Sequence, residues 1–552
     1  MTPRGAAARR PGVSMGPGTF LACWAIAAAV AIALGRDANW DIRNYHIYNP
    51  HALLEGRWAV DLAPAGLHSF LHPGLDIPFY LLVRSPLNAW PRVVSALQAG
   101  SLGLLAFLTL AVVNLACHGE ARRATGESIL VAAFGLTGAA TLPQAGATFN
   151  DVPVACLVMG ALLALLVALQ RAQRVAGLRF LAGVLGGVAV GLKLTAAIYP
   201  PALAAAAVLG ARGGTDRLRA LALLGAGGAS GFVLSFGPWG WFLYERFGNP
   251  FGPYLNDIFR SPWFPPAGQG DPRFLPDGPG QALLYPFLWA RPSIWVVTEE
   301  TMADPRFALG LTGVLLTAGV AGYRRLPRGR RQGPASPAAS AGTGQATRML
   351  LAFILVAYAV WLGAFAVLRY AVAIEVLLGV AVWAAARALL GASRADAVSA
   401  AARRGATLCV GTSLFLCTLT TTYPDWPRQP FEWEWEPRGA AAVAVTPVAL
   451  PEGSLVVTLW GAVSFVAPFL EGPGIRFVTA AHPVWAGSDL YRYGREVRQV
   501  VRSHQGSGFV LVEDPEDHNR DLARSLGIEI DPAACRMVAN NLTRLVQICR
   551  WR

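Results

Sequence analysis

The sequence predicts a mainly α-helical protein that crosses a membrane many times and carries a small C-terminal α/β domain. Of its 552 residues, 54% are hydrophobic and only 14% are charged, whereas soluble domains are about 25% charged. Apolar runs of about 18 or more residues recur between Phe20 and Thr421, which is the length that spans a bilayer as a helix. After Tyr423 the composition changes to shorter apolar runs.

The basic residues predict which way the chain is inserted. The formal net charge is +13, and the arginines gather in short loops between the apolar runs, a topology signal rather than a nucleic-acid surface. Residues 1–17, which include Arg4, Arg9 and Arg10, are therefore expected to be a cytoplasmic tail. No small-residue cleavage site follows the first apolar run, so we expect a retained helix.

The bundle is expected to occupy residues 18–422 with about 11 transmembrane helices. The expected spans are 20–34, 93–117, 128–142, 152–169, a block at 180–211 that crosses twice, 218–244, 307–323, 349–368, 370–385 and 406–421. The block at 180–211 lies between two basic loops, so it must cross an even number of times, with a break near 193–201. Residues 324–348 are of low complexity and are expected to be a disordered cytoplasmic loop.

The opposite side of the membrane receives loops 35–92 and 245–306 and a C-terminal domain, 423–552. In that domain, runs 454–460 and 508–514 are expected to be buried strands and 521–526 a helix. A hairpin is expected to turn at Asn540–Asn541, with Cys535 and Cys549 near its ends. The two cysteines could pair if the domain is extracytoplasmic.

The segment 35–78, directly after the first helix, is the densest in residues that carry chemistry. Asp41 lies just past the helix end and is a candidate general base for a sugar or lipid hydroxyl; the alternative is a solvated or capping carboxylate. Arg43 and Arg57 could hold phosphate oxygens in forked geometry. Tyr45 and His46 are candidates to contact the substrate, the aromatic ring by stacking on a sugar.

Metal binding is a weaker interpretation of the same segment. It holds four of the eight histidines, together with Asp41 and Asp76, and these types of side chain ligate divalent metals. Only His68 and His72 have a helical ligand spacing, and Pro73 interrupts it. We assign no metal ligand and no cofactor, although the sequence leaves the binding of a divalent metal ion possible.

Three further charged residues along the bundle are candidate site residues. Asp151 opens a helix and is a second catalytic candidate; its alternative is a cap, shared with Asn150. Lys193 lies within an apolar block, where a charge usually faces a cavity or a partner, although it could snorkel to the interface. Arg369, followed by Tyr370, could bind lipid phosphate or pair with Glu375.

Taken in order, these motifs resemble the GT-C superfamily of integral membrane glycosyltransferases, which includes protein-mannosyltransferase-like and aminoarabinose-transferase-like members. The resemblance covers roughly residues 15–390. The motifs are Asp41 after the first helix, Asp151-Val152-Pro153, the block Gly191 to Ala196, Pro238-Trp239, Gly248-Asn249-Pro250, and Arg369-Tyr370. One departure is that many members have two adjacent acids in the first loop, whereas the nearest acid here is Asp37, four residues before Asp41.

The resemblance implies a polyprenyl-phosphate-linked sugar donor and inverting transfer to a lipid, glycan or protein acceptor on the outer face of the inner (plasma) membrane. It implies Asp41 as base, Asp151 as support for the acceptor or a metal, and Lys193 and Arg369 as phosphate ligands. The alternatives are a lipid or sugar transporter or flippase, which would need charges along a path through the bilayer, and an assembly protein whose C-terminal domain binds partners. No nucleotide-binding glycine motif is present in the sequence, and no nucleic-acid partner is expected.

Overall fold

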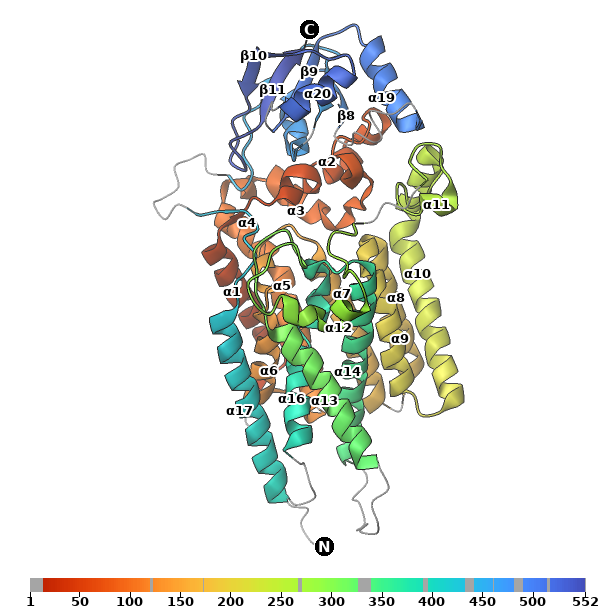
Figure 1. Cartoon of the computed structure of the whole chain (residues 1–552), viewed down its shortest axis with the longest axis vertical. Helices are drawn as coiled ribbons and strands as arrows, with labels where there is room; N and C mark the ends of the chain where they lie inside the picture. The colour runs from red at the N-terminus through yellow and green to blue at the C-terminus, as the bar shows by residue number, and fades with distance from the viewer. Residues whose placement is uncertain are drawn as a thin grey trace.

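The computed structural model consists of a helical bundle with a small sheet domain beyond one end (Figure 1). It describes residues 13–119, 123–171, 173–266, 271–325, 339–390, 396–431, 441–459, 461–480, 490–513 and 517–551. Most of the expected cytoplasmic tail and residues 326–338 of the expected disordered loop lie outside these ranges. Residues 339–348, expected to belong to the disordered loop, are instead the start of helix α14.

The bundle helices lie at the positions that the apolar runs predict. They are α1 Pro17–Leu34, α4 Pro91–Gln98, α5 Gly100–His118, α6 Gly126–Leu136, α7 Asp151–Gln170, α8 Val175–Leu192, α9 Tyr199–Gly210, α10 Gly214–Phe247, α13 Arg306–Arg325, α14 Ala339–Ala364, α15 Val372–Glu375, α16 Leu378–Leu389 and α17 Asp396–Thr420. The expected break in the block 180–211 is confirmed, since α8 ends before Lys193 and a 3-10 turn, η7 Leu194–Ile198, leads into α9.

The expected count of about 11 spans is not confirmed. Within the described ranges, seven helices are long and apolar enough to cross a membrane, or up to eight if the bent pair Leu368–Glu375 and Leu378–Leu389 is one span. Two expected spans are shorter apolar helices, Gly126–Leu136 and Leu194–Gly210. At a rise of 1.5 Å per residue, a helix of this length covers only part of a hydrocarbon core about 30 Å thick.

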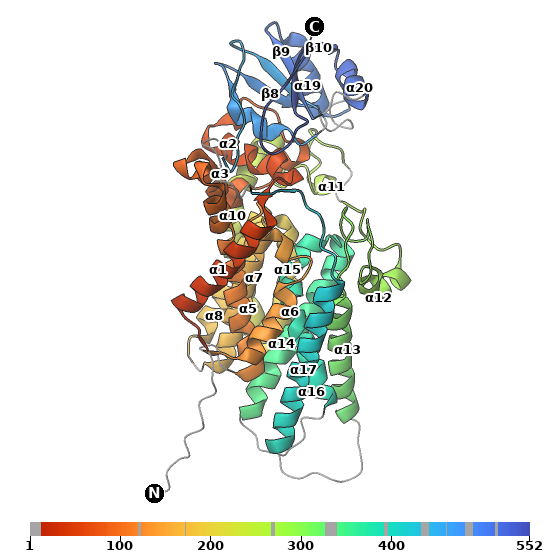
Figure 2. The ribbon, with the colours of Figure 1, turned by 90° about the vertical axis from the view of Figure 1, so that its left-hand side faces the viewer.

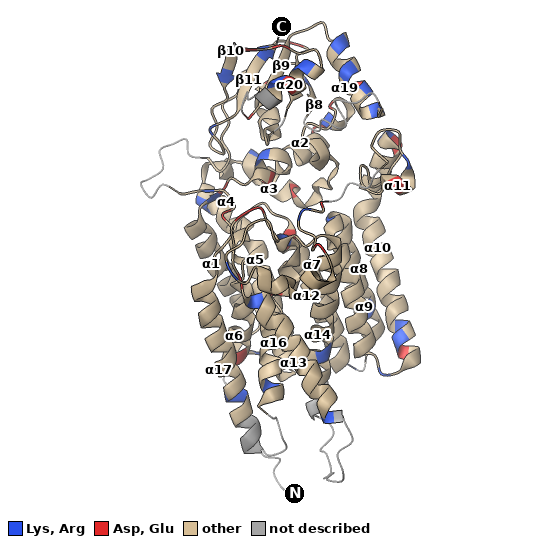
Figure 3. Cartoon of the chain, viewed as in Figure 1, with Lys and Arg blue, Asp and Glu red and all other residues tan. Residues whose placement is uncertain are grey.

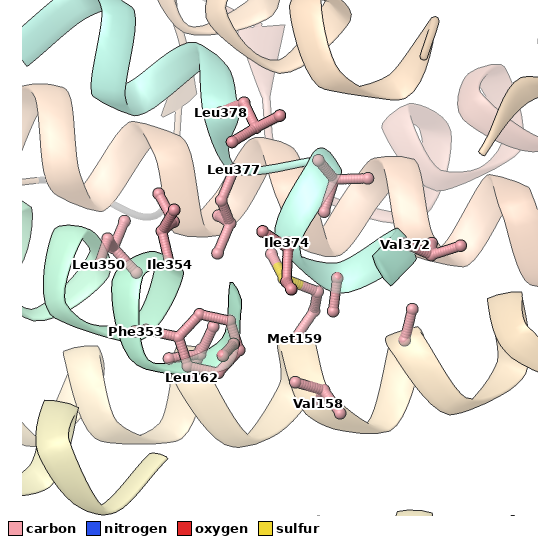
Figure 4. Close-up of a cluster of buried hydrophobic side chains, with 14 of the residues drawn as sticks. Val158, Met159, Leu162, Leu350, Phe353, Ile354, Val372, Ile374, Leu377 and Leu378 are labelled. Atoms are coloured by element: carbon pink, nitrogen blue, oxygen red, sulfur yellow. The ribbon is translucent and has the colours of Figure 1, made fainter. Parts of the chain in front are cut away.

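The centre of the bundle is formed by α7, α14 and the bent segment α15–α16. Figure 4 shows the side chains that meet there, which come from all three elements: Val158, Met159, Leu162, Leu350, Phe353, Ile354, Val372, Ile374, Leu377 and Leu378. All are buried. Because α15 begins two residues after Tyr370, this packing fixes the backbone that carries Arg369 and Tyr370.

Helices α8 and α10 approach so closely that only glycine fits between them. A Cβ added at Gly187 would lie 2.0 Å from the carbonyl oxygen of Gly228, and one at Gly183 would lie 2.2 Å from that of Leu224. Small residues spaced four apart let helix backbones touch in membranes. The contact continues at Gly191, where a Cβ would lie 2.0 Å from the Ser235 hydroxyl oxygen. Lys193, two residues later, is therefore held at a set height beside α10.

The segment between α1 and α4 folds into short helices above the bundle. They are a π-helix, η1 Ile42–His46, then α2 Tyr48–Leu54, η2 Arg57–Ala59, η3 Gly66–Phe70, η4 Pro73–Leu75, α3 Ile77–Arg84 and η5 Pro86–Ala89. These elements lie between the bundle and the sheet domain in both views (Figures 1 and 2). We call this end of the bundle, where α1 and α10 terminate at Leu34 and Phe247, the domain end.

The C-terminal domain contains a five-stranded sheet in the order β10-β11-β9-β6-β8. Its strands are β6 Leu455–Thr458, β8 Arg476–Thr479, β9 Gly508–Val512, β10 Ile530–Met537 and β11 Gln547–Trp551, with helices α19 Arg492–Ser503 and α20 Asp517–Ser525. β9, β6 and β8 are parallel, and β10–β11 is the expected antiparallel hairpin. A Cys535–Cys549 disulfide links the hairpin, so the expected strands, helix and cysteine pair are all present.

The segment after α1 shares one hydrophobic core with this sheet, which the expected domain boundaries did not anticipate. Ile42 and Trp58 belong to the same buried cluster as Val457 and Val510. Leu62 adds a β-bridge beside β8: its N–H donates to the Phe477 carbonyl at 2.9 Å, and its carbonyl accepts from the Thr479 N–H at 3.1 Å. The C-terminal domain therefore clamps the segment onto the bundle.

The glycine contact between α8 and α10 gives the first prediction. Gly187→Ala should destabilise the protein by about 1–3 kcal/mol, because the methyl group forces two backbones apart. Gly225→Ala on α10 is the matched control, since a Cβ there meets nothing within 4 Å. Thermal unfolding of both variants in detergent measures the difference; equal midpoints would contradict the close contact.

Candidate functional site

The chain enters the candidate site through a turn that binds Asp37 tightly. Gly35 has φ +93, and a Cβ there would lie 2.5 Å from the Gln429 carbonyl oxygen. The next two residues form β2 Arg36–Asp37, which pairs with β4 Arg428–Gln429. The Asp37 carboxylate accepts hydrogen bonds from the Asn39 N–H and from both the N–H and the hydroxyl of Thr148. The Asp37 carboxylate therefore fixes this turn through three hydrogen bonds.

Asp41 is 5% exposed and accepts a hydrogen bond from the guanidinium of Arg369, which lies on η8 Leu368–Ala371. The guanidinium carbon lies 4.9 Å from the ring centroid of Phe149. The sequence left Glu375 open as the partner of Arg369, and this is wrong: the Glu375 carboxylate accepts from the Ala140 N–H and the Thr141 hydroxyl. The ion pair instead joins residues 328 apart in the sequence.

A second ion pair lies beside the first. The Lys193 ammonium contacts Asp151 Oδ1 at 2.6 Å and lies 5.2 Å from the ring centroid of Tyr370. Its charge also interacts with Arg369 and Asp41. The five predicted residues Asp41, Asp151, Lys193, Arg369 and Tyr370 thus form one cluster, which we call the charge cluster. Asp151 Oδ2 is buried without a hydrogen-bond partner among the described residues, which leaves an acceptor for a ligand.

Tyr45 and His46 lie next to the charge cluster in the π-helix η1. The Tyr45 ring stacks on His68 with centroids 5.2 Å apart, and its charge interactions include Asp41, Arg369 and Tyr370. The His46 Nδ1 atom lies 2.5 Å from Asp76 Oδ1. His68 and Asp76 were not assigned a role from the sequence, because a spacing of 22 or more residues along an irregular segment gives no sign of contact.

Asn150 does not cap α7 as expected. Its side chain makes no capping hydrogen bond; instead its Nδ2 donates to Asp76 Oδ1 at 2.7 Å. The amide thereby ties the start of α7, and with it Asp151, to the segment above the bundle.

Arg43 and Arg57 point elsewhere. Arg43 forms an ion pair with Glu513 of the C-terminal domain. Arg57 holds Asp61 through both carboxylate oxygens, at 3.0 and 2.6 Å, and donates to the Ile475 carbonyl at 2.6 Å. Both guanidiniums join the segment to the sheet domain, so the structure does not bring them into the charge cluster.

Burial and neighbouring charges act in opposite directions on the pKa values of Asp41 and His68. Burial raises the pKa of the Asp41 carboxyl, but the positive charge of Arg369, with smaller effects of His46 and His68, brings that pKa well below its usual range. Burial lowers the pKa of His68 to about 4, against the opposing charge of Asp41. At neutral pH the site therefore holds an ionised Asp41 beside a neutral His68.

The described residues bring together no group of three or more His, Cys, Asp or Glu side chains that could hold a metal ion. Across these ranges, the four histidines of the segment instead contact separate partners: Asp76 for His46, Tyr80 for His51, Asn44 for His68 and the Ser235 carbonyl for His72. Within the described residues, these histidines therefore do not converge on one point where they could bind a metal ion together.

No protein-family model and no curated protein matches the chain. Among solved structures, the chain is similar to the crystal structure of ArnT from Cupriavidus metallidurans bound to undecaprenyl phosphate, with 13% identity and a TM-score of 0.43, over 96% of this chain and 97% of that one. At this identity and TM-score, no residue role or substrate passes from ArnT to this chain.

The buried, neutral His68 predicts how stability depends on pH. Between pH 6.5 and about 4 the unfolded chain takes up a proton at this histidine while the folded chain does not, so stability falls as the pH falls through that window. The shift corresponds to roughly 3 kcal/mol at its acid end. We expect His68→Gln to reduce the loss of thermal stability between pH 6.5 and 4 relative to the unsubstituted protein. An equal loss in both would show that His68 is not held neutral.

Proposed function

We propose that this chain is a membrane glycosyltransferase that moves a sugar from a polyprenyl-phosphate-linked donor to an acceptor at the outer face of the membrane. The observation that carries the proposal is the charge cluster: two cations and two carboxylates, paired and largely buried, at one end of an apolar bundle. A lipid-linked sugar presents its reactive carbon and its phosphate at that depth. Transfer requires cations for the leaving phosphate and a base for the incoming hydroxyl.

Two features support placing the domain end outside the cytoplasm. The C-terminal domain contains the Cys535–Cys549 disulfide, and disulfides persist in oxidising compartments. Several Lys and Arg residues lie at the opposite end of the bundle (Figure 3), as expected of the cytoplasmic side. The proposed location is the inner (plasma) membrane, with a cytoplasmic N-terminus and an extracytoplasmic C-terminal domain.

The pairing suggests how substrate starts the reaction. A phosphate anion between Lys193 and Arg369 competes with Asp151 and Asp41 for the two cations. As Arg369 turns toward the phosphate, Asp41 loses its partner and becomes a better base. Asp151, whose Oδ2 is already without a partner in the described structure, then orients the acceptor. Tyr45 and Tyr370 offer ring faces for the sugar.

In the transfer step the acceptor oxygen forms a bond to the anomeric carbon while the bond from that carbon to the phosphate oxygen breaks. The electron pair leaves with the polyprenyl phosphate, whose charge Lys193 and Arg369 neutralise. The proton of the acceptor hydroxyl passes to Asp41. Attack opposite the leaving phosphate inverts the anomeric configuration.

A lipid or sugar flippase is the alternative. It needs charged groups along a path between the two membrane faces, because a charge within the bilayer requires a partner or water. The charges of the described charge cluster instead lie together at the domain end, in two ion pairs. This distribution favours chemistry at one face over transport, and a site containing an unpartnered carboxylate oxygen favours it over a role in assembly alone.

Asp41→Asn should lower the rate of sugar transfer at least 100-fold, because the amide cannot accept the proton, a contribution of about 10²–10⁴ for a general base. The assay follows labelled sugar from a polyprenyl-phosphate donor in reconstituted vesicles. Asp277→Asn, on an exposed carboxylate of loop 245–306, is the control and should retain activity. Full transfer by Asp41→Asn would remove Asp41 as the base.

Lys193→Gln should weaken binding of polyprenyl phosphate about 10-fold or more, since a hydrogen bond to a charged group contributes roughly 1.5–3 kcal/mol. Lys193→Arg keeps the charge and should retain most of the affinity. Direct binding measured with the purified protein in detergent separates this effect from chemistry. Unchanged affinity in Lys193→Gln would place the phosphate elsewhere.

A further inference from the structure

His46 has a polar atom that the fold leaves unused. Its side chain is 1% exposed, and its Nδ1 faces Asp76 Oδ1 at 2.5 Å. Because a carboxylate only accepts, Nδ1 carries the hydrogen, and the neutral ring keeps its lone pair on Nε2. That Nε2 is buried and has no hydrogen-bond partner within the described part of the chain. Leaving such an atom unsatisfied is unfavourable, so it is available to accept a hydrogen bond or a proton from a ligand.

Asp76 is itself held in position. Asn150 Nδ2 donates to the same Oδ1 atom at 2.7 Å, and Asp76 is 3% exposed. A chain of two hydrogen bonds, Asn150 to Asp76 and Asp76 to His46, therefore connects the start of α7 to the imidazole. A carboxylate that fixes the tautomer and orientation of a histidine is the arrangement by which proteins prepare an imidazole to accept a proton at Nε2.

The π-helix places this imidazole next to Asp41. Residues five apart lie one turn from each other in a π-helix, and Asp41 is the N-cap of η1 while His46 is its last residue. The charges of Asp41 and His46 interact. The other titratable groups around His46 among the described residues are Asp76, His68 and Tyr45. The ring centroids of Tyr45 and His46 are 4.2 Å apart. Arg369 contacts Asp41, which lies between it and His46 in this series of contacts.

The reaction proposed above needs such a group. Asp41 is only 5% exposed, so a proton that it takes from the acceptor hydroxyl needs a second acceptor within the site. Histidine is the side chain that ordinarily holds a proton near neutral pH. We propose that His46, held by Asp76, receives at Nε2 the proton that Asp41 takes from the acceptor hydroxyl.

This role rests on the proposed transferase function, and its proton balance is complete. The acceptor O–H bond breaks, the proton moves through the Asp41 carboxylate to His46 Nε2, and the electron pair of the broken sugar–phosphate bond leaves on the polyprenyl phosphate. The imidazolium lies against the Asp76 carboxylate, which stabilises its charge. The proton returns to water when the products leave, and Asp41 and His46 are reset.

The test is the pH profile of kcat for sugar transfer in His46→Gln, Asp76→Asn and the control His51→Gln. His51 lies in the same segment but contacts the Tyr80 hydroxyl at 3.1 Å. The unsubstituted protein should lose activity at acid pH, because a proton already on Nε2 would block the transfer. His46→Gln should be at least 10-fold slower with that acid limb gone, while KM for the donor stays unchanged. His51→Gln should keep the profile.

Asp76→Asn keeps the imidazole but removes the anion that stabilises its charged form, so the acid limb should move to lower pH. This variant tests the role independently if His46→Gln folds poorly. Transfer by His46→Gln at the original rate, or with the original acid limb, would overturn the role of His46 alone. If the unsubstituted protein transferred no sugar from polyprenyl-phosphate donors, the proposed function itself would be overturned, and the role of His46 with it.

Discussion

Two ion pairs, Arg369 with Asp41 and Lys193 with Asp151, hold together the domain end of this molecule. They join four segments that are far apart in the sequence. Charges removed from water are tolerated when they are paired, and removing one partner leaves the other at a cost of several kcal/mol. The segments around the pairs are therefore constrained to meet. An anion bound to Lys193 and Arg369 would leave the carboxylates of Asp41 and Asp151 without these partners, and each could then accept a proton or a hydrogen bond from a hydroxyl.

The two ion pairs form because packed elements of the fold fix the position of each charged residue. The glycine contact between α8 and α10 sets the place of Lys193, and the buried cluster of α7, α14 and α15 sets that of Asp151 and Arg369. Asp41 depends on the C-terminal domain, since the segment that follows it shares a core with the sheet. Arg57 and Arg43 reinforce this clamp. The C-terminal domain thus belongs to the construction of the site, although its strands lie beyond the bundle.

The sequence predicted the helical segments, the break at Lys193, the cysteine pair and the residues of the charge cluster. It did so because apolar runs and basic loops report which side of a membrane each loop reaches, and loops on one side can converge. It did not predict the partners of Arg43, Arg57, Arg369 and Asn150. A charge at a loop tip is compatible with any opposite charge on the same side, and only packing decides between them. The number of spans is not confirmed, because the apolar character of a run does not show where a short helix ends.

A comparison of two arginines at the domain end shows why the charge cluster is suited to exchange its partners. Arg306 is fully buried; it donates to Asp304, to the Phe134 carbonyl and to the hydroxyls of Thr137 and Thr421. Such a guanidinium cannot leave without stranding several acceptors.

Arg369, by contrast, has a side chain that is 24% exposed. Within the described structure its side chain hydrogen-bonds only to Asp41, and its remaining contacts are the ring faces of Phe149 and Tyr370. Ring faces attract a cation without requiring a fixed hydrogen-bond direction. Arg369 can therefore turn from a carboxylate to a phosphate and keep its aromatic contacts, which Arg306 cannot do. The fold thus contains one arginine fixed by several acceptors and another whose only described hydrogen-bond partner is a single carboxylate.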